Sequence, residues 1–358
     1  AAAGATPADK AKAAWTAFAS DASGTGPFKM ARFVPRERLE LVANKTYWDP
    51  KRTTKLDRVV LVPMPEANAR TAALLSGQVD WIEAPAPDAM PQITSRGFKI
   101  YSNAQPHVWP WQLSFAEGSP WLDKRVRHAA NLCVDREGMK TMLGGMMAVP
   151  KGTVPPGHPW WGNPKFDIKY DTNAAKALMT KAGHSAAKPL KVKIQISASG
   201  SGQMQPLPMN EMLQQNLAEV GIKIDFEVVE WNTLINLWRA GAKSDLAKGA
   251  NGLNFSYFIQ DPFTAFIRHL DSKLVAPNGT NWGFYQDPEM DALLEKARTT
   301  FEPKAQDAVL QKIHEKIVDD ALFLFVTHDV APRAMSPKVT GFVQAQNWFQ
   351  DFSPITMK

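Results

Sequence analysis

Apolar and polar residues alternate in the first part of the chain with the period of half-buried strands. Residues 28–34 show this alternation directly after a turn at 23–27 that contains two glycines and a proline, and residues 56–63 show it again. Residues 67–75 instead place apolar side chains at helical spacing and end at a Ser-Gly pair. The first part of the chain therefore predicts strands followed by a helix.

Helical and strand patterns alternate through the rest of the chain. Asp123 is the predicted N-cap of one helix, and Asp171 is the predicted N-cap of another that stops at Gly183. Two βαβ-like units follow in tandem, which indicates a mostly parallel sheet and an α/β fold. The expected strands cover 191–196, 222–228 and 322–326, and the expected helices cover 124–132, 174–182, 210–220, 289–297 and 305–319.

Composition narrows the class of protein. The 358 residues are 44% hydrophobic and 21% charged, without an apolar run of 18 or more, which fits a globular chain with room for two domains. The net charge of +6 comes from interspersed basic and acidic residues, and no Lys/Arg block with interleaved aromatic residues stands out. This pattern argues against a nucleic-acid partner and favours ordinary surface charge.

The residue types that carry catalysis or bind metals form no recognisable constellation. The seven histidines include no H-x-H or H-x-x-x-H pair, and the single cysteine, Cys133, lies on the apolar side of a predicted helix. The sequence Gly200-Ser201-Gly202 fits neither the G-x-S-x-G nor the G-x-G-x-x-G motif. The sequence therefore predicts no cofactor, no metal site and no enzymatic activity. An α/β hydrolase with an unrecognised site is the alternative from another functional class.

Several motifs occur in a fixed order along the chain. They are GTGPF at 24–28, N-x-x-Y-W at 44–48 and A-R-x-x-A-L-L-x-G-x-V-D at 69–80. A further element, D-x-R-V-R-x-A at 123–129, is followed by Asp135-Arg136. Together they resemble the peptide/dipeptide/oligopeptide-type (family 5) solute-binding proteins of bacterial ABC importers, and the resemblance covers nearly the whole chain.

This resemblance implies a two-lobed α/β fold of the periplasmic-binding-protein type II class. It implies that the chain crosses between the lobes near Leu113 and near His328. Residues 1–112 and 330–358 would then form lobe I, and residues 113–329 would form lobe II. Family members carry a long segment before the GTGPF turn. The resemblance therefore also implies that lobe I is incomplete in this chain and is completed by an N-terminal segment of the same protein.

The resemblance further implies that the chain is the ligand-binding component of an ABC importer and that it acts in the periplasm. Two hinged lobes would close over a small-molecule ligand, and the closed form would dock on the permease. Segments that face the cleft in the family here contain indoles, amides and hydroxyls, which bind solutes by stacking and by directional hydrogen bonds. For the tryptophans, burial in the core is the alternative interpretation. The expected ligand-binding residues are Trp109, Trp111, Gln112, Ser201, Gln203, Tyr257, Phe258, Asp261 and Trp282.

Phe258 decides the expected class of ligand. In peptide-binding members of the family, an aspartate three residues before an acidic residue–proline pair holds the α-ammonium group of the peptide. The pair is Asp261-Pro262 here, and the earlier position is Phe258. A buried ammonium group without its carboxylate loses hydration without compensation. The expected ligand is therefore an oligosaccharide, a modified sugar or another non-standard solute. A conventional di- or oligopeptide, with Asp261 as its replacement anchor, is the alternative.

Overall fold

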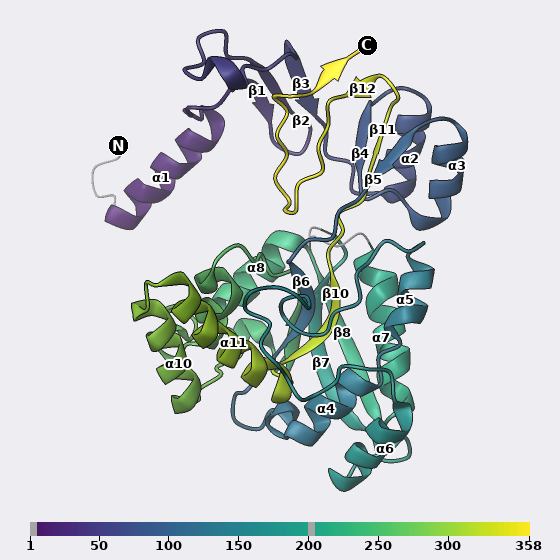
Figure 1. Ribbon diagram of the computed structural model, residues 1–358, viewed down its shortest axis with the longest axis vertical. Helices are drawn as coiled ribbons and strands as arrows, with labels where there is room; N and C mark the ends of the chain where they lie inside the picture. Colours follow the sequence, from purple (N-terminus) through teal and green to yellow (C-terminus); the bar gives the residue numbers. More distant parts are fainter. Residues whose placement is uncertain (1–5, 200–204) are drawn as a thin grey trace.

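The computed structural model describes residues 6–199 and 205–358, which form two lobes joined by two crossing segments (Figure 1). Both ends of the described chain belong to the upper lobe, lobe I, and the middle of the chain forms the lower lobe, lobe II. No described helix has the length and apolar character that would let it cross a membrane.

The first sheet of lobe I follows the predicted turn at 23–27. β1 (Phe28–Val34), β2 (Arg38–Ala43) and β3 (Arg58–Leu61) pair in sequence order as an antiparallel sheet. Neither β1 nor β3 contains a fully buried residue, and the preceding helix α1 (Pro7–Ser20) also buries none. This part of lobe I therefore exposes much of its apolar surface.

The second sheet of lobe I combines the two ends of the chain. β11 (Arg333–Met335), from the C-terminal segment, pairs antiparallel with both β4 (Trp81–Glu83) and β5 (Lys99–Tyr101). Helices α2 (Ala67–Leu75) and α3 (Met90–Ser95) contribute to the small core beside this sheet. The C-terminal return is thus an integral part of lobe I. A short pair of strands, β12 (Val339–Thr340) and β13 (Thr356–Met357), follows near the end of the chain.

The sheet of lobe II is mixed, not mostly parallel as the sequence suggested. Its strand order is β10-β6-β9-β7-β8, where β7 pairs parallel with β8 and β9, and β6 pairs antiparallel with β9 and β10. The two antiparallel pairings join segments that are far apart in the sequence, so local patterns did not reveal them. The strands are β6 (Val108–Leu113), β7 (Leu190–Ser197), β8 (Ile222–Val229), β9 (Gly252–Asn254) and β10 (Phe323–His328).

Two hydrophobic cores lie against this sheet because successive strand residues point to opposite faces. In β10, Leu324 and Val326 belong to one core, and Phe323 and Phe325 belong to the other. The first core includes residues of α4 (Lys124–Leu132), α5 (Arg136–Met142), α6 (Thr172–Lys181) and α7 (Pro206–Glu219). The second includes residues of α8 (Trp231–Ala240), α9 (Arg268–Leu270), α10 (Pro288–Thr299) and α11 (Pro303–Asp319).

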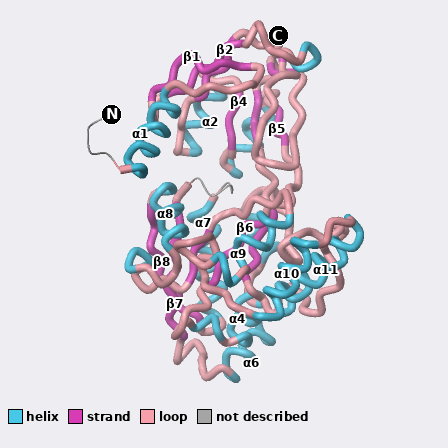
Figure 2. Tube along the Cα trace, turned by 90° about the vertical axis from the view of Figure 1, so that its left-hand side faces the viewer, coloured by secondary structure: helices cyan, strands magenta, loops and turns pink. Residues whose placement is uncertain are grey.

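The two crossing segments run side by side between the lobes. The backbone N–H of Gln105 donates to the carbonyl of Asp329 (2.8 Å), and the N–H of Asp329 donates to the carbonyl of His107 (3.0 Å). Since β6 belongs to the sheet of lobe II, we propose that the first crossing lies before Val108, earlier in the chain than expected. The second crossing follows β10, beside His328. In Figure 2 these segments lie on one side of the molecule.

Candidate functional site

Four of the expected ligand-binding residues lie inside lobe II. Trp109, Trp111, Tyr257 and Trp282 are each at most 1% exposed and belong to its two cores. The indole N–H of Trp111 donates to the side-chain oxygen of Asn210 (2.8 Å). β6 is an interior strand that is buried along its whole length, so both of its tryptophans are enclosed by the protein in this conformation. The core interpretation of these aromatic residues therefore describes the structure better than the expected ligand contact.

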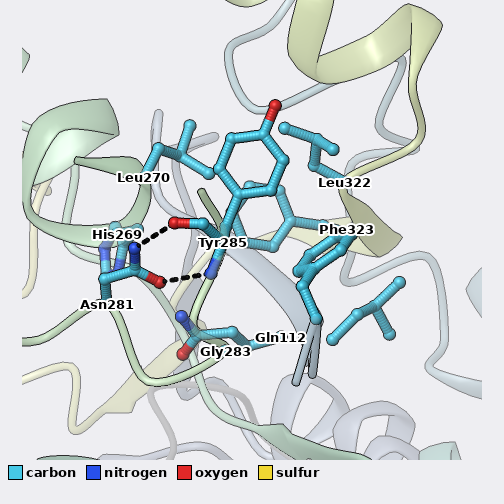
Figure 3. A pocket seen from close by; sticks show the side chains of 10 residues that line it. Gln112, His269, Leu270, Asn281, Gly283, Tyr285, Leu322 and Phe323 are labelled. Atoms are coloured by element: carbon cyan, nitrogen blue, oxygen red, sulfur yellow. Dashed lines mark hydrogen bonds between the residues drawn. The ribbon is translucent and has the colours of Figure 1, made fainter. Parts of the chain in front are cut away.

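Gln112 also faces the interior and not the cleft. It lines a small cavity of ≈ 10 Å³ together with Leu270, Tyr285 and Phe323 (Figure 3). Beside this cavity, the side chain of Asn281 donates to the carbonyl of Tyr285 (2.8 Å) and accepts from its backbone N–H (3.1 Å). The cavity is at the lower limit for one water molecule and is far too small for a transported solute.

Phe258 lies at the junction of the two lobes. Its ring centroid is 4.8 Å from that of His107, 5.2 Å from that of Trp348 and 5.7 Å from that of Phe349. Asp261 is exposed, and its carboxylate accepts a hydrogen bond from the backbone N–H of Thr264 (2.9 Å), as a turn cap does. Ser201 and Gln203 lie outside the described residues. Phe258 thus contacts lobe I through its ring.

A recess of ≈ 510 Å³ opens beside this junction. Gln346 and Asn347, from the C-terminal segment of lobe I, form one side, and Pro106 belongs to the first crossing. Lobe II contributes the remaining lining residues, which are His158, Trp160, Ile259 and Gln260. A volume of this size is in the range of small-molecule sites in proteins. The recess therefore offers a cleft-like site whose walls come from both lobes.

Hydrogen bonds attach both walls to the first crossing. The side-chain amide of Gln105 donates to the carbonyl of Asn347 (3.0 Å), and that of Gln346 donates to the carbonyl of Ala104 (3.3 Å). On the other wall, the backbone N–H of Ile259 donates to Nδ1 of His107 (3.1 Å). A rotation about the crossing would therefore change the shape of the recess.

The buried titratable groups at the two crossings carry little charge near neutral pH. Asp329 is fully buried, and burial raises the pKa of its carboxyl to about 8. Burial lowers the pKa of His107 and of His328 to about 4. The carboxyl is therefore mostly protonated and both imidazoles are neutral at pH 7. Within the described residues, no cluster of three or more His, Cys, Asp or Glu side chains is arranged to hold a metal ion.

Sequence reasoning missed most of the residues that line the recess. Gln260 adjoins the expected residues Phe258 and Asp261 in the sequence, but nothing local singled out Gln346 or Asn347. The available signal was a group of amides beside aromatic residues in two separate loops, at 257–260 and 344–349. Only the tertiary fold brings these loops together.

Comparisons with known proteins agree with this architecture. The model of the family "Bacterial extracellular solute-binding proteins, family 5 Middle" matches residues 1–267. The chain is 28% identical over 340 residues to heme-binding protein A of Haemophilus influenzae, and the aligned region covers 93% of this chain and 59% of that protein. It is 24% identical over 336 residues to the oligopeptide-binding protein AppA of Bacillus subtilis, and this aligned region covers 89% of this chain and 59% of that protein.

A solved structure shows the same fold. The dipeptide-binding protein from Pseudoalteromonas sp. SM9913, in complex with Met-Leu, superposes with a TM-score of 0.80 at 20% identity, covering 94% of this chain and 64% of that one. This similarity confirms the expected α/β periplasmic-binding-protein type II fold. The chain spans 59% of the length of the two curated relatives named above.

Proposed function

The chain belongs to the family 5 bacterial extracellular solute-binding proteins, and we propose that it captures a small solute between its lobes for an ABC importer. The observation that carries the proposal is the recess, whose walls come from both lobes and are bonded to one crossing segment. Closure about the crossings would enclose the solute, and the closed form would dock on the permease at the periplasmic face of the membrane. This cycle involves no covalent chemistry.

The proposed ligand is an oligosaccharide, a modified sugar or another non-standard solute. Phe258 supports this choice because it places an uncharged ring where peptide-binding relatives are expected to have a carboxylate. A di- or oligopeptide is the second candidate, favoured by the name of the relative AppA. The hydrolase alternative has less support. Within the described residues, no serine hydroxyl or cysteine thiol is hydrogen-bonded to a histidine ring, and Cys133 is buried and donates to the carbonyl of Ala130.

We also propose that a further segment of the same protein covers the β1–β3 sheet of lobe I. Large apolar side chains of this region are exposed, among them Phe33, Trp48 and three consecutive residues at 60–62. An exposed apolar surface of this kind commonly marks an interface. The covering segment would complete lobe I.

Native mass spectrometry of the protein purified from its source tests the proposed function. We expect a retained small molecule that dissociates on mild activation and that raises the melting temperature when it is added back. A protein that retains nothing, and whose melting temperature no peptide or saccharide raises, would contradict a solute-binding function.

A further inference from the structure

The recess at the lobe junction has an uncharged lining. None of its described lining residues is Lys, Arg, Asp or Glu; they are Pro106, His158, Trp160, Ile259, Gln260, Gln346 and Asn347. Burial lowers the pKa of His158 below its usual value, so this imidazole is also neutral at pH 7. We propose that the recess is a binding site for an uncharged, hydroxyl-rich solute of short-oligosaccharide size, and this rests on the proposed function.

Three side-chain amides give the recess both donors and acceptors. Gln346 uses its amide N–H in the bond to Ala104, which leaves its oxygen available as an acceptor. Asn347 uses its oxygen to accept from the backbone N–H of Phe349 (2.9 Å), which leaves its NH₂ group available as a donor. Gln260 is exposed, while its backbone N–H donates to the hydroxyl of Thr264 (3.2 Å) and holds the loop. Sugar hydroxyls donate and accept, so they match such a set without a change of charge.

Trp160 supplies a fixed flat surface on the lobe II side. Its indole N–H donates to the carboxylate of Asp307 (2.9 Å), and its ring lies 4.7 Å from that of His158 and 5.8 Å from that of Phe266. These contacts hold the ring orientation before any ligand arrives. A rigid aromatic ring beside amides suits a solute with an apolar ring face and a polar edge, as a pyranose has.

The charges around the recess disfavour solutes that carry a negative charge. Two carboxylates lie at its margin, since Asp307 holds Trp160 and Asp261 follows Gln260 in the chain. Both would repel an anion, and both already accept hydrogen bonds from protein groups. A zwitterionic peptide would need a cationic partner for its carboxylate, and no described lining residue provides one. An uncharged solute avoids both penalties.

Isothermal titration calorimetry on the 358-residue chain tests this assignment with maltotriose, cellotriose and raffinose as neutral probes and alanyl-alanine as the zwitterionic probe. We expect at least one trisaccharide to bind and the dipeptide not to bind. Gln260→Ala and Gln346→Ala remove one amide from each lobe, and each should weaken trisaccharide binding about 3- to 10-fold, as loss of one hydrogen bond does. Gln92→Ala, at an exposed position on α3, should leave binding unchanged.

Three outcomes separate this inference from the proposed function. Binding of the dipeptide without any trisaccharide would overturn the inference and leave the solute-binding function standing. Trisaccharide binding that neither Gln260→Ala nor Gln346→Ala weakens would place the solute elsewhere and also overturn it. The absence of binding by all four probes overturns the inference, and native mass spectrometry then decides separately whether the protein carries another solute.

Discussion

The indole N–H of Trp348 donates a hydrogen bond to the buried carboxyl of Asp329 at 3.0 Å. Trp348 belongs to the C-terminal segment of lobe I, and Asp329 lies in the second crossing. The hydroxyl of Ser256, from lobe II, contacts the same carboxyl at 2.9 and 3.1 Å. One carboxyl therefore joins both lobes at the crossing, close to the ring of Phe258, which contacts Trp348.

Replacing Asp329 by Asn should change stability in a pH-dependent manner. Burial raises the pKa of the folded-state carboxyl to about 8, above its ordinary value of 3.8. The folded state therefore binds one more proton than the unfolded state between these values, and the contribution of Asp329 to stability falls as the pH rises toward 8. Asn is neutral at every pH. The melting temperature of Asp329→Asn relative to the wild type should thus be higher at about pH 8.5 than at about pH 5.5.

The comparison of the two proteins at each pH removes the contribution of other groups. His107 and His328, whose pKa values are lowered to about 4, titrate in both proteins and cancel in the difference. A difference in melting temperature that stays constant across this pH range would show that the carboxyl does not titrate in the folded protein as stated.

Trp348→Phe should destabilise the protein because it removes a donor to a buried carboxyl while keeping an aromatic ring beside His107. We expect a loss of about 1–2 kcal/mol in urea unfolding. Trp48→Phe is the matched control, since Trp48 is 73% exposed and its indole N–H donates to the carbonyl of Thr25 at the surface. The control should change stability by less than about 0.5 kcal/mol. Equal losses in the two variants would contradict the role of the Asp329 contact.

Arg136 compensates for a proline in an interior strand. Pro110 of β6 is the register partner of Phe325 in β10 and has no N–H to donate. The guanidinium of Arg136 donates instead to the carbonyl of Phe325, through Nη2 at 2.6 Å and Nε at 3.0 Å. Arg136→Met should therefore cost about 3 kcal/mol, measured by urea unfolding. Arg96→Met, at an exposed position, should have little effect, and a similarly small effect of Arg136→Met would contradict this interpretation.

The exposed apolar surface of lobe I should make the 358-residue chain self-associate. Phe33→Ser combined with Leu61→Ser replaces two exposed side chains of the β1–β3 sheet. We expect less self-association in sedimentation velocity and less binding of the dye ANS, with a change in unfolding free energy below about 1 kcal/mol. A large loss of stability would show instead that these side chains belong to a core of the isolated chain.

Local patterns predicted the elements better than their assembly. Asp123 and Asp171 cap helices as expected, because their carboxylates accept from backbone N–H groups two and three residues later. The first crossing was expected near Leu113, at the end of β6, and the strands β9 and β10 that pair with β6 lie far away in the chain. The same cause explains why Trp109 and Trp111 were expected to contact the ligand but lie in the core. The local sequence does not distinguish a tryptophan that precedes a crossing from a tryptophan in a buried strand. Gln260 and Gln346 line one recess only because the tertiary structure brings their loops to the same place.

The distance between the lobes tests the central claim most directly. Spin labels at Ala72→Cys on α2 and Asn236→Cys on α8 lie in separate lobes, and both positions are exposed. Figure 2 shows these helices on the side away from the crossings. Cys133 is buried, and burial raises the pKa of its thiol to about 12, so it should not take up label. Double electron–electron resonance should show a shift to shorter distances when a neutral trisaccharide is added. At a subsaturating concentration of the trisaccharide, the shifted fraction should be smaller with Gln260→Ala than in the parent protein. An unchanged distance distribution in the presence of bound solute would contradict capture between the lobes.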